Sequence, residues 1–458
     1  MHDKNSGIRY ARPMKFGDRV TGTIQGYDEK GRGAADTLSV PFTCRGDEIA
    51  ATFMKRDKGR KILRLESVAT SGPDRVPTPC PHAGSCGGCL WQHIAYDAQL
   101  REKRDRVNAA FAAAGYEERV GEVVPCGEPF HYRNRMDYAV GWQGTIGLKE
   151  YGSWNRYLDL STCLLLDEET PAILDACRTL MHDLPLEPWD ARDHHGQFRY
   201  VVIRRGKNTG QRMITLVVSD VGRIDAAARA TILERLSPLC TSLLLGEQPK
   251  ITDLSLVERV ETLKGEPWIE EAVNGVRYRI APNSFFQTNT DMAAKLQEMV
   301  LGHVADGPRH SVLDLYCGLG FFGIALAKRD PAIGVYGFEI DAEAIGLAAS
   351  NAEANGVNDR CSFTSGPAED LSWKDIAADT VILDPPRAGL HPRVLATVLE
   401  KRPAHIVYVS CNYRRLVEEM KDFKKHYRVE SVAALDLFPH TPHVEVVAKL
   451  VRNVPFGI

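Results

Sequence analysis

The feature that most constrains this chain is the alternation of helical and strand patterns from about residue 280 to its end. Segments typical of amphipathic helices and of buried strands follow one another in the order DMAAKLQEMVLGHV, SVLDLYCGLG, FFGIALAKR, VYGFEID, AEAIGLAASNAEANG and TVILDPPR. HIVYVSCN and VEVVAKLV add two further strands. This alternation predicts an α/β domain in which helices cover a parallel sheet and ligands bind at the carboxyl ends of the strands.

A glycine-rich turn follows the first of these strands. Gly318, Gly320 and Gly323 form a GxGxxG pattern, and Glu339 lies 21 residues beyond Gly318. Glycines let the backbone approach a ligand closely, and an acidic residue at this spacing can bind ribose hydroxyls. Taken alone, the pattern fits a nicotinamide dehydrogenase as well as an S-adenosylmethionine-dependent methyltransferase.

Two aspartates favour the methyltransferase. Asp314 precedes the glycines in DLYCGLG, a form that is usual where S-adenosylmethionine is bound. Asp384 opens DPPR at the end of a later strand, where nucleotide-modifying methyltransferases keep an acidic or amide group followed by prolines. Tyr316 is placed either to stack on adenine or to pack against the sheet, and Cys317 is expected to be a small buried residue.

A cysteine and a glutamate are the candidates for the chemistry. Cys411 in YVSCN ends an apolar strand, and strand ends in this architecture face the ligand crevice. A thiolate that adds to carbon 6 of uracil makes carbon 5 nucleophilic enough to take a methyl group, after which a base must remove the proton from carbon 5. Glu445, just before VVAKLV, is the candidate base, because a glutamate there is rarely core without a partner. The roles of His440 and His443 are open.

A second group of cysteines has the spacing of a metal site. Cys80, Cys86 and Cys89 follow C-x5-C-x2-C, and Cys163 is the best fourth ligand by position. Four thiolates suit either tetrahedral zinc or a cubane iron–sulfur cluster, and the three-plus-one arrangement favours the cluster. The chain has 11 cysteines, an odd number, which together with this spacing indicates ligation rather than disulfides and a reducing, cytoplasmic compartment.

The front of the chain differs from the rest. Residues 14–70 show short alternating strands between glycines, which predicts a small barrel of the OB type. The whole chain has a net charge of −3, whereas residues 1–70 hold 14 Lys/Arg against 9 Asp/Glu, a net charge of +5. Such a surface suits an RNA backbone, although a solvated charged face is the alternative. Residues 1–10 lack a secretory signal, and no apolar run is long enough to span a membrane.

Taken together, these motifs resemble the RNA uracil-5-methyltransferase family, most closely its iron–sulfur-containing 23S ribosomal RNA branch. The resemblance covers nearly the whole chain and is carried by SFFQTN, DLYCGLG, LDPPRAGL, VSCN and FPHTPHVE. It implies a TRAM-like OB barrel over residues 1–72, a mostly β central domain with the cluster over 73–279, and a Rossmann-like class I methyltransferase domain over 280–458. A helix near 95–114 is expected to pack on the catalytic domain.

The resemblance also implies roles for individual residues. Cys411 would be the nucleophile and Glu445 the proton acceptor. The S-adenosylmethionine contacts would come from Gln287, Tyr316, Gly318, Gly320, Glu339 and Asp384. A 4Fe-4S cluster would be held by Cys80, Cys86, Cys89 and Cys163. The chain departs from many relatives at one position, because Phe321 stands where they carry Asn after CGLG.

The expected function is therefore methylation of carbon 5 of a uridine in 23S ribosomal RNA by a cytoplasmic, monomeric enzyme. The first alternative is the same chemistry on a tRNA uridine. A second alternative, from a different class, is a non-catalytic iron–sulfur RNA-binding protein, for which Phe321 is the only support. A nicotinamide dehydrogenase remains as a third, on the glycine pattern alone.

Overall fold

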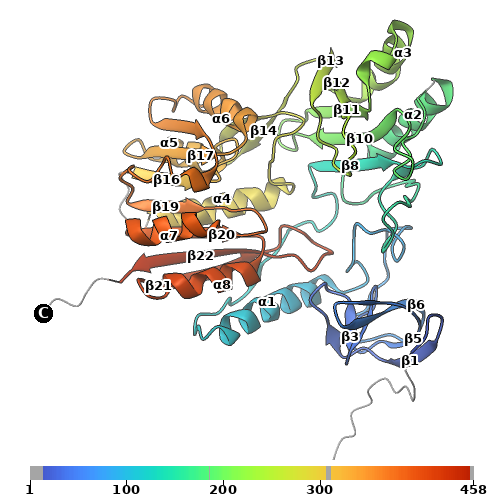
Figure 1. Ribbon diagram of the computed structural model, residues 1–458, viewed down its shortest axis with the longest axis horizontal. Helices are drawn as coiled ribbons and strands as arrows, with labels where there is room; N and C mark the ends of the chain where they lie inside the picture. Colours follow the sequence, from blue (N-terminus) through green and yellow to red (C-terminus); the bar gives the residue numbers. More distant parts are fainter. Residues whose placement is uncertain (1–13, 185, 306–310, 454–458) are drawn as a thin grey trace, which may run out of the picture.

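The computed structural model describes residues 14–184, 186–305 and 311–453. The first ten residues, in which no secretory signal is expected, lie outside these ranges. The described chain forms a small sheet at its N-terminal end, a central sheet, and a large sheet flanked by helices (Figure 1). In the described residues, no helix is both long and apolar enough to cross a membrane.

The first sheet has six strands in the order β1-β5-β6-β4-β3-β2. Their bounds are β1 Arg19–Thr23, β2 Gly26–Tyr27, β3 Gly33–Ala35, β4 Leu38–Val40, β5 Glu48–Asp57 and β6 Arg60–Thr70. Neighbouring strands are antiparallel except for β4 and β6, which are parallel. The sheet has a core of its own, in which Ile24, Leu38, Val40 and Leu63 are buried.

The second sheet has the order β13-β12-β11-β10-β8-β9. Its strands are β8 Arg135–Val140, β9 Ile146–Gly147, β10 Phe198–Arg205, β11 Arg212–Val218, β12 Ser242–Glu247 and β13 Arg259–Lys264. Helix α2 (Thr170–Asp183) also belongs to this part of the chain. A second helix, α3 (Ala226–Leu236), was not predicted from the sequence. Asp225 caps its N-terminus by accepting a hydrogen bond from the Ala228 N–H at 2.8 Å.

The large sheet has the order β18-β17-β16-β19-β20-β22-β21-β7. Its strands are β7 Val123–Val124, β16 Ser311–Leu315, β17 Gly334–Glu339, β18 Cys361–Ser365, β19 Thr380–Leu383, β20 His405–Ser410, β21 Tyr427–Leu435 and β22 Glu445–Arg452. Strands β16 to β20 pair in parallel, as predicted. The prediction of a fully parallel sheet is wrong for β22, which is antiparallel to both β20 and β21 because no crossover helix separates β21 from β22.

Helices cover this sheet, and one of them comes from earlier in the chain. Those from the C-terminal part are α4 Thr290–Ala305, α5 Phe321–Arg329, α6 Ala342–Ala354, α7 Pro392–Lys401 and α8 Tyr413–Phe423. The helix predicted near 95–114 is α1 (Tyr96–Ala113), and it lies against α8 (Figure 1). Val107 and Phe111 of α1 are fully buried in the same core as Leu416 of α8. The hairpin of β14 (Ile269–Val273) and β15 (Val276–Ile280) packs on α4, α5 and α6.

Candidate active site

The glycine-rich turn lies at the carboxyl end of β16 and leads into α5. Gly318 and Gly320 have positive φ angles of 55° and 85°, and Gly320 is the residue that precedes α5. A Cβ atom on Gly320 would lie 2.6 Å from Ile324 Cδ1 at a φ that L side chains rarely adopt, so a larger residue there is strained. The Gly318 N–H donates to Glu339 Oε2 at 3.3 Å, and this contact brings together the two residues that the 21-residue spacing linked.

Three carboxyl groups gather at the ends of β16, β17 and β19. Burial, and then the charge of Asp384, raises the pKa of Asp314 to about 8. Burial, and then the charge of Glu339, raises the pKa of Asp384 to about 7. Asp314 Oδ2 accepts a hydrogen bond from the Gly323 N–H at 3.2 Å, whereas its Oδ1 has no partner among the described residues. Such a site favours a cationic ligand, because a positive charge would offset the mutual repulsion of the carboxylates.

Two other predicted cofactor residues flank this turn. Tyr316 is partly buried against the core that contains α1 and α8, and burial raises its pKa to about 12. Gln287 is 8% exposed, and its backbone carbonyl oxygen accepts a hydrogen bond from Asn134 Nδ2 at 2.9 Å. Phe321 does not take the place of an amide: its ring packs in the core against Tyr278 and Phe286, with centroids 5.5 and 5.6 Å away.

The structure brings Cys411 and Glu445 together. Cys411 follows the last residue of β20, and Glu445 is the first residue of β22. These strands pair antiparallel with Ser410 opposite Val446, so the register continues with Cys411 opposite Glu445. Burial, and then the charge of Glu445, raises the pKa of Cys411 to about 11. Burial also raises the pKa of Glu445, which is 3% exposed, well above its usual value.

Arg387 is a third member of this group to which the sequence analysis gave no role. Its guanidinium lies close to both side chains and lowers the pKa of Cys411 and of Glu445, against the larger effect of burial. Asn412, which caps α8, donates a hydrogen bond to the Arg387 carbonyl oxygen at 2.9 Å and so ties the DPPR segment to the nucleophile's strand. The signal in the sequence was the arginine that directly follows the two prolines.

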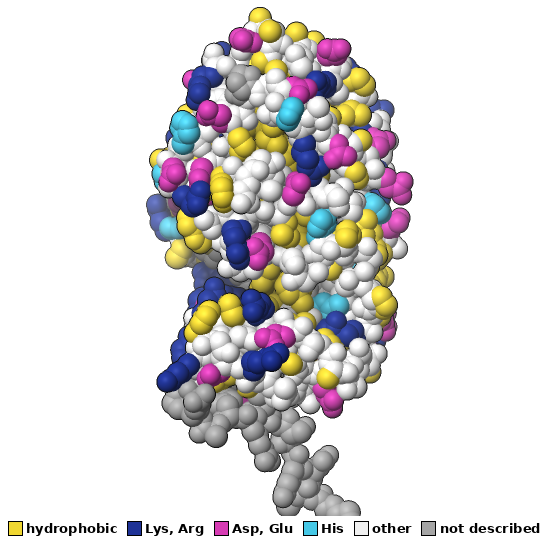
Figure 2. All heavy atoms as spheres, turned by 90° about the vertical axis from the view of Figure 1, so that its right-hand side faces the viewer, with side chains coloured by type: hydrophobic (Ala, Val, Ile, Leu, Met, Phe, Trp, Pro, Cys, Tyr) yellow, Lys and Arg dark blue, Asp and Glu magenta, His cyan; other side chains and the backbone are white. Residues whose placement is uncertain are grey.

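Cys411 opens into a cleft of about 410 Å³ that all three parts of the fold line. Its cationic residues are Lys30 from the first sheet, Arg106 from α1, and Arg387 and Arg414 beside the nucleophile; Glu29 is the one acidic residue among its lining side chains. Figure 2 shows Lys and Arg side chains gathered where the molecule narrows above the N-terminal sheet. A basic cleft that leads to a thiol suits a polyanionic substrate.

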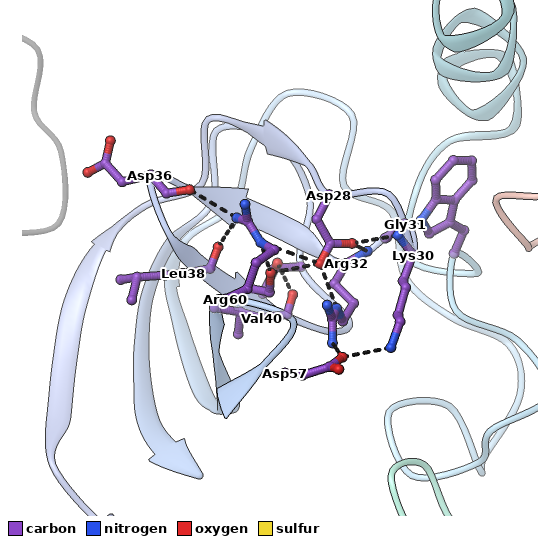
Figure 3. Close-up of polar contacts among 12 residues, drawn as sticks. Asp28, Lys30, Gly31, Arg32, Asp36, Leu38, Val40, Asp57 and Arg60 are labelled. Atoms are coloured by element: carbon purple, nitrogen blue, oxygen red, sulfur yellow. Dashed lines mark hydrogen bonds and ion pairs between the residues drawn. The ribbon is translucent and has the colours of Figure 1, made fainter. Parts of the chain in front are cut away.

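The turn between β2 and β3 carries Lys30 into this cleft, and a polar network fixes the turn (Figure 3). Buried Asp28 accepts from Arg32 Nε at 2.6 Å, and Asp57 accepts from Lys30 Nζ at 2.6 Å. The Gly31 carbonyl oxygen accepts from Trp91 Nε1 at 2.6 Å. Gly31 has a φ of 79°, and a Cβ there would lie 2.6 Å from Pro442 Cβ, so the turn packs directly on the loop that precedes Glu445.

The loop between β21 and β22, residues 436–444, is held by α1. Lys103 Nζ donates to Asp436 Oδ1 at 2.6 Å, and both side chains are 0% exposed. Gln99 accepts a hydrogen bond from the His440 N–H at 2.9 Å. Burial lowers the pKa of both His440 and His443 to about 4, so both rings are neutral at neutral pH.

The four cysteines predicted to bind metal line one pocket, together with Leu148, Leu160 and Leu165. Burial raises the pKa of Cys86 to about 11 and that of Cys89 to about 12. Within the part of the chain that the structure describes, however, no three His, Cys, Asp or Glu side chains are arranged to hold a metal ion. The structure therefore brings the four residues of the sequence pattern to one pocket without showing ligation.

Comparison with known proteins identifies the class. Residues 268–453 match the family described as tRNA (Uracil-5-)-methyltransferase. The tRNA (uracil(54)-C(5))-methyltransferase of Pyrococcus horikoshii is 35% identical over 94% of this chain and 100% of its own length. An uncharacterized RNA methyltransferase of Halalkalibacterium halodurans is 32% identical over 96% of this chain and 98% of its own. The crystal structure of Pyrococcus abyssi tRNA (uracil-54, C5)-methyltransferase with S-adenosyl-L-homocysteine has a TM-score of 0.81 and 34% identity, and covers 94% of this chain and 99% of that one.

The fold, with three carboxyl groups at the ends of β16, β17 and β19, is that of a class I S-adenosylmethionine-dependent methyltransferase. The chain belongs to the RNA uracil-5-methyltransferase family and is an S-adenosylmethionine-dependent RNA (uracil-5-)-methyltransferase. The family, the enzyme class and the cofactor predicted from the sequence are thus confirmed, and the dehydrogenase and non-catalytic alternatives are set aside. The predicted 23S ribosomal RNA branch has no support among these relatives, because those named with a substrate act on tRNA.

Proposed function

We propose that this enzyme methylates carbon 5 of a uridine in tRNA. The Cys411–Glu445 pair at the end of the basic cleft carries the chemical part of this proposal. The substrate follows from relatives that are named as tRNA (uracil(54)-C(5))-methyltransferases and match along their whole length. This support favours the tRNA alternative over 23S ribosomal RNA, which the iron–sulfur motif first suggested.

In the proposed reaction, the Cys411 thiolate adds to carbon 6 of the uracil ring, and the electron pair of the carbon 5–carbon 6 double bond becomes available at carbon 5. S-adenosylmethionine supplies the methyl group that carbon 5 takes up. The Glu445 carboxylate then removes the proton from carbon 5, the double bond forms again, and the thiolate leaves carbon 6. The target base must leave its stack, because the thiolate approaches the face of the ring.

The charges in the site support these roles. A thiol with a pKa of about 11 must lose its proton to react, and the Arg387 guanidinium is the group that stabilises the thiolate. Burial raises the pKa of Glu445 in the free enzyme despite the nearby Arg387, so its carboxyl must lose a proton before it can act as a base. A sulfonium cation bound near Asp384 and Glu445 would favour that loss. Its conversion to the neutral thioether of S-adenosylhomocysteine on methyl transfer would then raise the pKa of Glu445 again, when this residue takes the proton from carbon 5.

The cofactor would lie along the turn after β16. We propose that Gly318, Gly320 and Tyr316 line the adenosine side and that Glu339 binds the ribose hydroxyls. Asp384 and Gln287 would face the reacting end. The Gly318–Glu339 contact at 3.3 Å and the narrow Gly320 turn support this placement.

The test of the mechanism is a covalent adduct. Glu445→Gln should accumulate a protein–RNA adduct with tRNA and S-adenosylmethionine, because the thiol cannot leave while carbon 5 keeps its proton. Cys411→Ala is the matched control and should form none. Adduct formation by neither variant, with both folded, would contradict the assigned pair.

The test of the substrate is methyl transfer from labelled S-adenosylmethionine to unmodified tRNA and 23S ribosomal RNA, followed by nucleoside mapping. Labelled 5-methyluridine at one tRNA position is expected. Label confined to 23S ribosomal RNA would overturn the tRNA assignment and leave the mechanism intact.

We further propose that Cys80, Cys86, Cys89 and Cys163 hold a 4Fe-4S cluster with a structural or RNA-orienting role. Their common pocket and its leucine lining support this, since thiolates in an apolar shell are the usual environment of such clusters. Anaerobic purification with iron, sulfide and zinc analysis tests this; zinc without iron would refute the cluster.

The N-terminal strands β1 to β6 are proposed to be the TRAM-like, OB-type RNA-binding barrel of residues 1–72. Their basic balance and the position of Lys30 in the cleft support that role. We propose boundaries at 73–279 for the central domain and 280–458 for the catalytic domain, with α1 and β7 packed on the latter.

A further inference from the structure

A second cleft, of about 400 Å³, lies between the central sheet and the segment that leads into α4. Its lining side chains include three arginines and one aspartate, a net charge of +2. Arg135 pairs with that aspartate, Asp137, at 2.7 Å. Arg133 and Arg204 have no carboxylate within ion-pair distance among the described residues. The side chains that line the cleft therefore carry an excess of positive charge. The thiols of Cys89 and Cys163, which do not line it, lie close enough to Arg133 to interact with it.

Arg204, near the end of β10, is the most buried of the three. It is 3% exposed, and its guanidinium donates to the carbonyl oxygens of Pro282 and Ser284, while its Nε has no partner among the described residues. Burial lowers the pKa of Arg204 well below its usual value. Burial of the Arg204 charge carries a desolvation penalty. An anion that entered the neighbouring solvent-open cleft would offset this penalty.

The cleft lies close to the reaction site but apart from the proposed cofactor turn. Phe286 and Thr288 of its wall flank Gln287, whereas none of Tyr316, Gly318, Gly320, Glu339 and Asp384 lines it. The pKa of His443 is lowered first by burial and then by nearby cations, among which Arg133 follows Arg387 and Lys103. Arg133 therefore lies near His443. His443 lines the cleft of Cys411 and Arg133 lines the second cleft, so the two clefts lie near each other.

We propose that this second cleft binds a backbone phosphate of the RNA strand next to the target uridine, with Arg204 and Arg133 providing the charge and Arg135 the rim. The proposal rests on the RNA substrate proposed above and extends it to a second contact on the central domain. A phosphodiester fits because it is a compact anion, and guanidinium groups are its preferred partners in proteins. The carboxylate of S-adenosylmethionine is the competing anion.

Salt dependence of RNA binding tests the proposal. Arg204→Met should lower the slope of log K against log salt concentration by about 0.7–0.9, the value of one phosphate contact. This corresponds to a change of about threefold in relative affinity between 50 mM and 200 mM salt. Arg204→Lys should restore most of the slope. The affinity for S-adenosylhomocysteine should stay at the wild-type value in both variants.

Arg199 provides a matched control on the same strand. It is 1% exposed, donates to the carbonyl oxygens of Gln248, Lys250 and Thr252, and its pKa is also lowered by burial. It lies five residues from Arg204, about 16 Å along the strand, and does not line the cleft. Arg199→Met should therefore lose comparable stability but keep the wild-type salt slope.

If Arg204→Met does not fold, Arg135→Met serves instead, since the Arg135 side chain is 17% exposed. An unchanged slope in folded Arg204→Met or Arg135→Met would overturn the proposal. A loss of S-adenosylhomocysteine affinity in place of the slope would assign the cleft to the cofactor's carboxylate and also overturn it. Wild-type methylation of tRNA is measured in parallel, so that a failure of the RNA substrate itself is seen separately.

Discussion

The buried ion pair between α1 and the loop 436–444 gives the sharpest test of how the chain's parts are held together. Lys103 and Asp436 are both 0% exposed, and Lys103 also donates to the Phe438 carbonyl oxygen at 3.1 Å. Lys103→Met removes one partner and leaves a buried carboxylate without its counter-charge. Loss of one member of such a pair costs about 3–5 kcal/mol in the free energy of unfolding.

The same helix offers the control. Arg101 pairs with Asp97 and Asp74, and the three side chains are 48%, 73% and 37% exposed. Exposed pairs of this kind contribute about 0–1 kcal/mol, so Arg101→Met should change stability little. The double variant Lys103→Met with Asp436→Asn removes both charges and should recover part of the loss of Lys103→Met.

The assay is denaturant unfolding, monitored with a single spectroscopic probe, of the wild-type protein, Lys103→Met, Arg101→Met and the double variant. The kcat and KM are measured for each folded protein. Because α1 holds the loop that leads to Glu445, Lys103→Met should lower kcat more than it raises KM, whereas Arg101→Met should leave both unchanged. The reasoning fails if Lys103→Met and Arg101→Met are equally stable, or if the double variant is no more stable than Lys103→Met.

Three further outcomes are expected. Asp384, with a pKa raised to about 7, keeps a proton in the folded state at pH values where the unfolded state has lost it, so its contribution to stability falls as the pH rises from about 4 to 7. Asp384→Asn should therefore raise the melting temperature at pH 8 and weaken the binding of S-adenosylmethionine. An unchanged melting temperature would contradict this. Gly31→Ala places a Cβ 2.6 Å from Pro442 Cβ at a positive φ, so it should lower the free energy of unfolding by about 1–3 kcal/mol and also lower tRNA methylation. Thermal melting and single-turnover rates measure the two effects. Gly59→Ala is the control, because Gly59 also has a positive φ but no atom within 4 Å of the added Cβ. Arg387→Met removes the cation beside Cys411 and should slow methyl transfer and move the rate's rise to higher pH, whereas an unshifted pH profile would argue against thiolate stabilisation by Arg387.

The sequence by itself determined the local parts of the site. The strand, glycine turn and helix around Gly318 follow from periodicity and from the backbone freedom of glycine, which neighbouring residues decide. Cys411 at a strand end and Glu445 at a strand start were predicted for the same reason. Their roles as nucleophile and base were predicted from the chemistry of uracil methylation, whereas the register that sets them opposite each other comes from the pairing of β20 with β22.

Only the tertiary structure decided what residues far apart in the chain do together. It showed that β22 runs antiparallel, that β7 joins the catalytic sheet, and that Phe321 packs in the core. It also brought Arg387 to the thiol and joined Lys103 to Asp436, 333 positions apart. Periodicity reports which face of an element is buried, but the partner of that face is set by the packing of the whole chain, which no local pattern encodes.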